Sequence, residues 1–384
     1  MKVLHISSGH MYGGIERTLT TLCKHRAACA HLDHHVAFCF DARPASEIRA
    51  TGTPVHLLGS VRFSRPWTVW AARRNLMKLL KSGDFDVVIC HAAWPHALFA
   101  SVVRRAKIPL VMWAHDTLAG DHWTERRAAR VPPDLILVNS QTTRKTVEPL
   151  FPGVPQPVLH YPVEAGPVVS EQDRATVRAS LATPDKSTVI VTACRLEPWK
   201  GHRLLIDALG HLRGRDDWTA WIIGGPQRDH EKTYLAELQQ QAERLGIFDR
   251  IRFVGQRDDV PSLLASADVH CQPNTGPEPF GVAFVEALYA GLPVVTTAMG
   301  GPLEIVDASC GVLVEPDRPD ALAKQLDRLL DDPATRRALG RAGPARATRL
   351  CDPPVALARL YDALQQAVST HAAPDVVKGR LQPC

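Results

Sequence analysis

Residues 269–288 read VHCQPNTGPEPFGVAFVEAL, and this stretch decides the fold class. Its first four residues have the pattern of a short strand that is covered on both faces of a parallel sheet. A loop rich in glycine and proline follows, and the small and apolar residues from Val282 onward predict a helix that ends near Gly291. A buried strand, a loop and a helix in this order are typical of a doubly wound α/β fold.

The same alternation of short apolar runs and longer helical patterns extends along the whole chain. In the first half, strands are expected at residues 3–7, 36–40, 55–58, 86–90, 110–114, 135–139 and 158–161. A polar stretch at residues 163–186 interrupts the pattern, and further strands are expected at residues 188–193, 219–223, 251–254, 269–272, 294–297 and 312–314. Helical patterns such as residues 15–29 and 68–81 lie between the strands. Two successive sets of βαβ units predict two Rossmann-like domains that face a central cleft.

The expected division of the chain follows from this pattern. The N-terminal Rossmann-like domain covers residues 1–165 and the C-terminal one residues 166–350. Residues 351–368 contain a helical pattern with Leu357, Leu360, Tyr361 and Leu364 on one face. A weakly patterned tail, residues 369–384, is expected to fray.

Composition and charge limit the class of protein. Hydrophobic residues make up 45% and charged residues 22% of the 384 residues, which is the balance of a folded globular protein. No run of eighteen apolar residues occurs, and Met1 leads straight into a strand pattern without the features of a signal peptide. Nine cysteines without a CxxC pair read as reduced thiols, so we expect a cytoplasmic protein.

The net charge of +5 is unevenly distributed. Residues 1–165 hold 20 Lys and Arg against 12 Asp and Glu, whereas the remaining residues hold 25 against 28. A basic N-terminal half predicts an anionic partner, either a phosphorylated acceptor or an acidic membrane surface. An ordinary solvated basic surface explains the charge equally well, and nothing indicates a nucleic-acid partner.

The loop before the helix at Val282 is the strongest candidate for chemistry. The backbone N–H groups around Phe280, Gly281 and Val282 are expected at a helix N-terminus, which favours a diphosphate through its unpaired donors and its dipole. Glu278 precedes the helix, and Glu286 lies within an otherwise apolar helical run where a carboxylate has no structural reason. A carboxylate can accept one hydrogen bond from each of the two adjacent hydroxyls of a ribose. The alternative is a capping carboxylate and a surface glutamate.

Three further segments lie at the ends of predicted strands. Arg195 and Lys200 follow the strand at residues 188–193, where two cations suit a diphosphate and the charge that grows on it as it leaves. Gly13 and Gly14 follow the strand at residues 3–7 and allow the backbone to approach a ligand closely. His115 follows the strand at residues 110–114, where a functional role and a satisfied polar role are equally expected.

Together these segments resemble the retaining GT-B glycosyltransferases of glycosyltransferase family 4, over nearly the whole chain. The resemblance implies that residues 1–165 bind the acceptor and residues 166–350 bind the nucleotide-sugar. It also implies that the helix at residues 351–368 crosses back to the N-terminal domain. The most specific element is the Glu-x7-Glu pattern of Glu278 and Glu286. Met299-Gly300-Gly301-Pro302-Leu303-Glu304 resembles the family's Gly-Gly-x-Pro-Glu turn, with the proline one place early. Cys194 stands where the family usually has a glycine.

The resemblance implies roles residue by residue. Glu278 would hold a hydroxyl of the donor sugar and Glu286 the ribose, while His115 would bind the transferred sugar near the reaction centre. Catalytic roles would thus belong to Glu278, His115, Arg195 and Lys200. Donor-binding roles would belong to Gly13, Gly14, Arg195, Lys200, Gly225, Val254, Glu278, Phe280, Gly281, Val282 and Glu286.

The resemblance also implies the reaction. A sugar would pass from a UDP- or GDP-sugar to an acceptor, lipid-linked or polysaccharide, with retention of anomeric configuration, in the synthesis of an envelope polysaccharide or glycoconjugate. No metal and no cofactor is expected, in line with the absence of an Asp-x-Asp motif in a ligand-like position. A nucleotide-sugar epimerase or hydrolase of GT-B shape and a non-catalytic sugar-nucleotide-binding module are the alternatives. A dinucleotide oxidoreductase is disfavoured because the first βα turn lacks GxGxxG spacing.

Membrane association is a separate expectation. Arg73, Arg74, Lys78 and Lys81 follow Trp67-Thr68-Val69-Trp70 on one predicted helix. A basic helix with tryptophans could lie on anionic lipid at the inner face of the membrane and reach a lipid-linked acceptor. The alternative is a helix packed on its sheet with the basic face in water.

Overall fold

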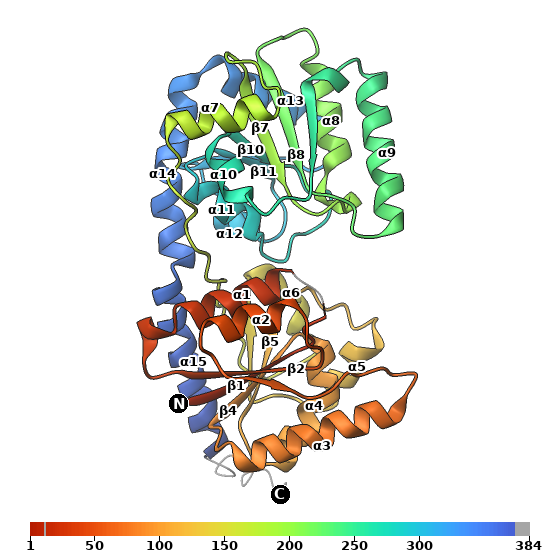
Figure 1. Cartoon of the computed structure of the whole chain (residues 1–384), viewed down its shortest axis with the longest axis vertical. Helices are drawn as coiled ribbons and strands as arrows, with labels where there is room; N and C mark the ends of the chain where they lie inside the picture. The colour runs from red at the N-terminus through yellow and green to blue at the C-terminus, as the bar shows by residue number, and fades with distance from the viewer. Residues whose placement is uncertain (11–12, 373–384) are drawn as a thin grey trace, which may run out of the picture. The chain divides into compact units, whose positions relative to one another are not determined.

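The computed structural model describes residues 1–10 and 13–372, and the chain forms two compact units. The first unit comprises residues 1–162 together with the segment that begins at Asp352, and the second comprises Val163–Cys351. Each unit is built on its own six-stranded parallel sheet with helices packed around it (Figure 1). The expected doubly wound Rossmann-like class is therefore confirmed for both units. Residues 369–372 of the expected frayed tail instead continue the last described helix, and the rest of the tail lies outside the described residues.

The first unit has the strand order β3-β2-β1-β4-β5-β6. Its elements are β1 (Lys2–Ser7), α1 (Gly14–Lys24), a 3-10 helix (Arg26–Cys29), β2 (Asp33–Phe38), α2 (Arg43–Ala50), β3 (Val55–Leu57), α3 (Pro66–Ser82), β4 (Val87–His91), α4 (Ala93–Arg105), β5 (Leu110–Ala114), α5 (Trp123–Ala129), β6 (Leu135–Val138), α6 (Gln141–Val147) and α15 (Pro353–Ala372). Helix α15 packs against the 3-10 helix, α1 and β5, so the last described helix belongs to this unit.

The second unit has the strand order β12-β11-β10-β7-β8-β9. Its elements are α7 (Glu171–Ser180), β7 (Thr188–Ala193), a 3-10 helix (Pro198–Lys200), α8 (His202–His211), β8 (Trp218–Ile223), α9 (Asp229–Arg244), a 3-10 helix (Phe248–Arg250), β9 (Ile251–Gly255), α10 (Val260–Ala265), β10 (Val269–Gln272), α11 (Val282–Tyr289), β11 (Val294–Thr297), α12 (Pro302–Ile305), β12 (Gly311–Val314), α13 (Pro319–Asp331) and α14 (Pro333–Cys351).

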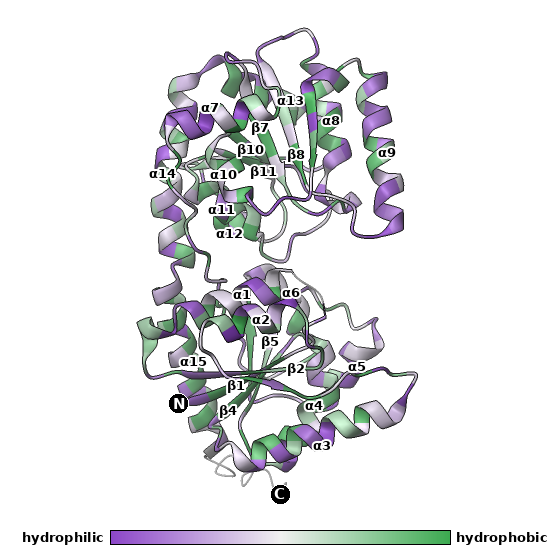
Figure 2. Ribbon diagram, viewed as in Figure 1, coloured by the Kyte–Doolittle hydropathy of each residue, from purple (hydrophilic) through white to green (hydrophobic). Residues whose placement is uncertain are grey.

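Burial of the strands on both faces holds each sheet between its helices. Every residue of β8 and of β10 is buried, and Figure 2 shows the strands as mainly hydrophobic while α9 carries hydrophilic side chains. Trp218 and Trp221 are among the largest fully buried side chains. Their indole N–H groups donate to the carbonyl of Leu212 and to the hydroxyl of Thr183, each at 3.1 Å, so the large apolar burial leaves neither donor unpaired.

One local expectation was wrong. Residues 158–161 do not form a strand, and Val158 makes only an isolated bridge with Val138. This segment still lies along β6, because the amide of Val138 donates to Pro157, but Pro157 has no N–H with which to continue a ladder. The polar stretch at residues 163–186, which interrupts the strand pattern, contains α7, and Ser170 caps this helix by accepting from the amide of Asp173.

Candidate functional site

The candidate residues of the second unit lie together at the point where the strand order of its sheet reverses. From β7 the chain moves to β8 on one side, whereas β10 lies on the other side of β7. In a parallel sheet this point leaves a crevice between the loops at the carboxyl ends of the two strands. Arg195 and Lys200 follow β7, and Glu278 follows β10.

Lys200 and Glu278 form the centre of this candidate site. The Lys200 ammonium donates to Glu278 Oε2 at 2.6 Å, and both side chains are about nine-tenths buried. Asn274 Nδ2 donates to the same oxygen at 3.3 Å. The ammonium also lies 3.9 Å from the ring centre of Trp199, a cation–π contact. Asn274 and Trp199 were not among the predicted residues, although a polar side chain just after a buried strand was a usable signal.

Close backbone packing fixes the two loops against each other. Gly201 has φ +80°, and a Cβ on it would lie 1.7 Å from the carbonyl oxygen of Pro273. The amide of Thr275 donates to the carbonyl of Trp199 at 2.9 Å. The loop after β7 therefore lies directly on the loop after β10, and only glycine fits at the point of contact.

The turn after β11 holds Glu278 from its other side. The amide of Gly301 donates to the carbonyl of Glu278 at 2.7 Å. A Cβ on Gly300 would lie 2.5 Å from the same carbonyl oxygen, and a Cβ on Gly301 would lie 2.2 Å from the carbonyl oxygen of Phe280. The two glycines thus let this turn pack on the backbone of residues 278–280.

Helix α11 begins immediately beside the ion pair. Gly281 is its N-cap with φ +104°, a Cβ on Gly281 would lie 3.3 Å from Cγ of Glu278, and the preceding residue Phe280 is buried. Val282 is the first helical residue and Glu286 lies one turn further, half-buried. The positive end of the helix dipole and the Lys200 ammonium are therefore close in the structure to one carboxylate, an arrangement that can bind an anion and orient hydroxyl groups.

The remaining predicted residues of this unit lie around the same sheet edge. Arg195 is exposed and pairs with Glu197 at 3.0 Å instead of with Glu278. Gly224 and Gly225 follow β8, and a Cβ on Gly224 would lie 2.1 Å from the carbonyl oxygen of Cys194. Val254 is half-buried in β9, at the edge of the sheet.

Cys194 is inert in this setting. Its sulfur lies 3.4 Å from Nε2 of His202, but burial raises the pKa of the Cys194 thiol to about 11. Burial likewise lowers the pKa of His202 to about 4. Both groups are therefore neutral near pH 7 and add no charge beside Lys200.

Gly13, Gly14 and His115 belong to the first unit. Gly13 is the N-cap of α1, where its amide donates to Glu16 at 3.1 Å, and Gly14 is exposed at the first helical position. His115 is buried just beyond β5, and both of its ring nitrogens are within hydrogen-bond distance of protein groups, His91 and Tyr161.

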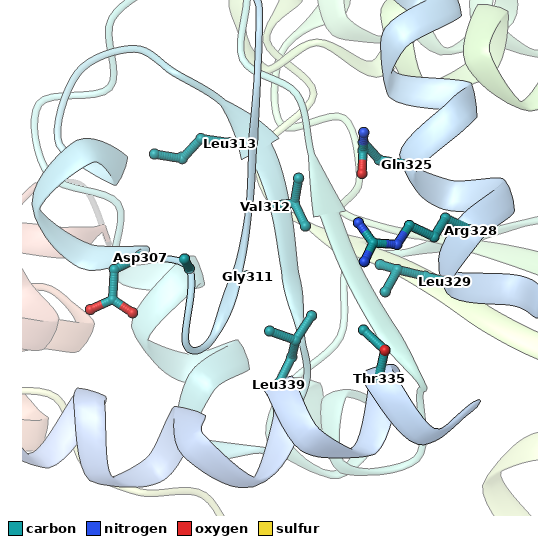
Figure 3. A pocket seen from close by; sticks show the side chains of 10 residues that line it. Asp307, Gly311, Val312, Leu313, Gln325, Arg328, Leu329, Thr335 and Leu339 are labelled. Carbon is teal, nitrogen blue, oxygen red and sulfur yellow. The ribbon is translucent and has the colours of Figure 1, made fainter. Parts of the chain in front are cut away.

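A separate hollow of about 500 Å³ lies between β12, α13 and α14. Figure 3 shows Val312, Leu329 and Leu339 on its walls, with Arg328 and Asp307 at its borders. None of the predicted site residues lines it. Among the described residues, no cluster of His, Cys, Asp and Glu could hold a metal ion, and no helix is both long and apolar enough to cross a bilayer.

Two family models match the chain. Residues 173–346 match glycosyl transferases group 1, and residues 12–160 match glycosyltransferase family 4. A GDP-mannose-dependent alpha-(1-6)-phosphatidylinositol monomannoside mannosyltransferase of Mycolicibacterium smegmatis is 31% identical over 70% of this chain and 73% of its own length. A D-inositol 3-phosphate glycosyltransferase of Salinispora tropica is 37% identical over 53% of this chain, which spans somewhat under half of that relative's length.

The solved structures give the same fold. The crystal structure of Anabaena Alr3699/HepE in complex with UDP-glucose is 25% identical, with a TM-score of 0.82 over 95% of this chain and 99% of the other. A glycosyltransferase from Rickettsia africae, 15% identical, has a TM-score of 0.84 over 96% of this chain and 98% of its own. The chain therefore belongs to the group 1, family 4 glycosyltransferases of GT-B fold.

Proposed function

We propose that the chain transfers a sugar from a UDP- or GDP-sugar to an acceptor, with retention of anomeric configuration. The observation that carries the proposal is the pair of Lys200 and Glu278 beside the start of α11, at the switch point of the second sheet. The cation and the helix dipole suit the diphosphate and its growing charge, while the carboxylate suits a sugar hydroxyl. Family membership supports the same reaction class.

UDP and GDP are the two candidate nucleotides of the donor. The Mycolicibacterium smegmatis relative is described as GDP-mannose-dependent, whereas HepE was crystallised with UDP-glucose. A thermal-shift panel with UDP, GDP, ADP and NAD separates the two, because a ligand at a hundredfold excess over its Kd stabilises by ~2.7 kcal/mol. We expect one of UDP and GDP to stabilise the wild type and to lose that effect in Glu286→Ala. Glu243→Ala, on the exposed face of α9, is the matched control.

The reaction itself needs a second assay. We expect nucleoside diphosphate release to depend on an added acceptor, to continue in EDTA, and to yield a product whose anomeric proton coupling matches the donor. Release without acceptor would instead favour a GT-B-shaped hydrolase, and sugar interconversion an epimerase. Stabilisation by NAD alone would contradict the whole proposal, and nucleotide binding without any turnover would favour a binding module.

We also propose that α3 docks peripherally on an anionic membrane, at the inner face of a bacterial envelope, where a lipid-linked acceptor would lie. Trp67 and Trp70 are 65% and 64% exposed on this helix, and Phe63 just before it is 42% exposed. Arg74 packs over the Trp70 ring with 5.6 Å between the guanidinium carbon and the ring centre. Exposed indoles beside a basic face are the features of an interfacial helix.

Liposome sedimentation tests this docking. We expect binding to need anionic lipid, to weaken with salt, and to fall in the double variant Trp67→Ala/Trp70→Ala. Phe248→Ala, a partly exposed aromatic residue of the second unit, is the control and should bind as the wild type does. Equal recovery in the supernatant at every lipid composition would contradict membrane docking and leave the transfer reaction unaffected.

A further inference from the structure

Four buried histidines lie on neighbouring strands of the first sheet. They are His34 on β2, His5 on β1, His91 at the end of β4 and His115 just beyond β5. In the strand register His34 pairs with Val3, His5 with Ile89 and His91 with Trp113. Each histidine is thus two residues nearer the carboxyl edge than the one before. Because side chains alternate between faces, steps of two place all four on one face of the sheet.

Hydrogen bonds join these four rings in a continuous series that ends at Tyr161. We call the four histidines and Tyr161 together the histidine chain. His34 Nδ1 lies 2.9 Å from His5 Nε2, and His5 Nδ1 lies 2.9 Å from His91 Nε2. His91 Nδ1 lies 2.9 Å from His115 Nε2, and His115 Nδ1 lies 2.6 Å from the Tyr161 hydroxyl oxygen. The rings of His91 and His115 are stacked at 5.1 Å. One row of contacts therefore runs from β2 to the predicted sugar-binding residue.

The rings of the histidine chain are neutral near pH 7. Burial lowers the pKa of His34 to about 4 and that of His115 to about 3, and it lowers the pKa of His5 and His91 well below the usual value. A neutral imidazole has one donor nitrogen and one acceptor nitrogen. The tautomer of each ring therefore dictates the tautomer of the next. The hydrogen bonds of the histidine chain can run in only two directions, one with every ring protonated on Nε2 and one with every ring protonated on Nδ1.

The short contact between Tyr161 and His115 favours one direction. Its hydroxyl lies 2.6 Å from His115 Nδ1 but 3.4 Å from the carbonyl oxygen of His115. Asn139 Nδ2 donates both to that carbonyl and to the Tyr161 oxygen, each at 3.0 Å, so the oxygen already accepts a hydrogen bond. The short contact is best satisfied when the Tyr161 hydroxyl donates to Nδ1. His115 then carries its proton on Nε2 and donates to His91.

His34, at the other end of the histidine chain, favours the opposite direction. The same tautomer on every ring leaves an N–H on His34 Nε2, which is buried without a hydrogen-bond partner among the described residues. An unsatisfied buried donor costs ~1–3 kcal/mol. Tyr161 and His34 therefore favour opposite tautomers of the histidine chain. Because Tyr161 contacts His115 directly at 2.6 Å, we infer that Tyr161 sets the tautomer of His115.

We propose that the histidine chain acts as one directional hydrogen-bonded unit that fixes the tautomer and ring orientation of His115. His34, His5, His91 and Tyr161 are accordingly positioning residues for sugar transfer. The part concerning sugar transfer rests on the proposed function, whereas the tautomer of His115 does not. Since both His115 ring nitrogens are engaged inside the first unit, a bound sugar would meet a ring that cannot rotate without breaking the row.

Nitrogen-15 NMR of the histidine-labelled full chain near pH 7.5 tests the unit directly. We expect the rings of His34, His5, His91 and His115 all to be Nε2–H tautomers in the wild type. Tyr161→Phe removes the donor that selects the direction, so all four rings should shift together toward mixed tautomers, including the distant His34. Any Nδ1–H or charged ring in the wild type, or a response confined to His115, would overturn the proposal.

His56→Phe is the matched control. His56 forms a similar stacked pair with His35, with ring nitrogens 3.1 Å apart, but it lies outside the histidine chain. The His56→Phe variant should leave the tautomers of the four histidines and the transfer activity unchanged.

Activity provides the second measurement. We expect Tyr161→Phe to lower kcat about tenfold or more with the donor KM changed less than twofold, because misorientation of a group near the reaction centre acts on the transition state. An unchanged kcat with altered tautomers would overturn the positioning role. A wild type that shows the single tautomer but no transfer would refute the proposed function alone and leave the directional unit standing.

Discussion

His96 on α4 gives a sharp test of how burial couples protonation to stability. Its side chain is fully buried, Nε2 lies 2.8 Å from the carbonyl oxygen of Val131, and Nδ1 has no partner among the described residues. Nε2 therefore carries the proton and donates, and a second proton on Nδ1 would create a buried charge with an unsatisfied donor. Burial accordingly lowers the pKa of His96 from 6.5 to about 4.

The free energy of unfolding depends on pH through His96, because the folded and the unfolded chain bind its proton with different pKa values. Between about pH 6.5 and about pH 4 the unfolded chain binds a proton at His96 that the folded chain does not, so acid favours unfolding. The contribution of His96 to stability is complete above its unfolded pKa and is lost as the pH falls toward its folded pKa. At about pH 5 the loss amounts to ~2 kcal/mol, since one pKa unit corresponds to ~1.4 kcal/mol.

Urea unfolding measures this loss in the wild type and in His96→Gln. The unfolding is followed by far-UV circular dichroism at about pH 7.5 and at about pH 5. Glutamine can still donate to Val131 but does not titrate, so the variant should lose ~2 kcal/mol less than the wild type on acidification. Val102→Ala, buried on the same helix, should lower stability equally at both pH values. Parallel pH dependences for the wild type and His96→Gln would refute the reasoning.

Three further predictions concern the second unit. Gly301→Ala would place a Cβ 2.2 Å from the carbonyl oxygen of Phe280 and should displace the loop before α11, so that thermal shift no longer shows stabilisation by the donor nucleotide. Asp268→Asn weakens two arginine contacts and should destabilise the unit by ~1–3 kcal/mol in urea unfolding. Lys200→Met leaves the Glu278 carboxylate without its cation, so the double variant Lys200→Met/Glu278→Gln should be more stable than Lys200→Met alone in the same assay.

Each of these predictions has a contradicting outcome. Gly214→Ala, where an added Cβ meets nothing within 4 Å, is the control for Gly301→Ala, and equal nucleotide stabilisation in both variants would contradict the packing argument. An unfolding midpoint of Asp268→Asn equal to that of the wild type would show that the arginine contacts add nothing. A double variant less stable than Lys200→Met would show that the Glu278 carboxylate is satisfied without its cation.

The strand pattern was readable from the sequence because both sheets are buried on both faces. Residues 110–114, 188–193, 269–272 and 294–297 were predicted with the bounds that the structure has. Apolar β-branched runs between helical patterns leave little choice of element or of fold class. The failure at residues 158–161 has a local cause, since apolar content there indicated a strand while Pro157 prevented a regular ladder.

The candidate site was only partly readable. The sequence placed Lys200 and Glu278 after buried strands, but they are 78 positions apart, and only the order of the strands makes β7 and β10 neighbours. The contact of Gly301 with the backbone of Glu278 likewise depends on the placement of β11 beside β10.

The sequence by itself thus determined the elements, the fold class and the residue types at the strand ends, because periodicity and turn chemistry are local properties. The tertiary structure alone decided which side chains meet. His34, His5, His91 and His115 show no pattern along the chain, and they form one row only because the register shifts each by two residues between neighbouring strands. Strand order and register arise from packing between segments distant in sequence, which no local pattern encodes.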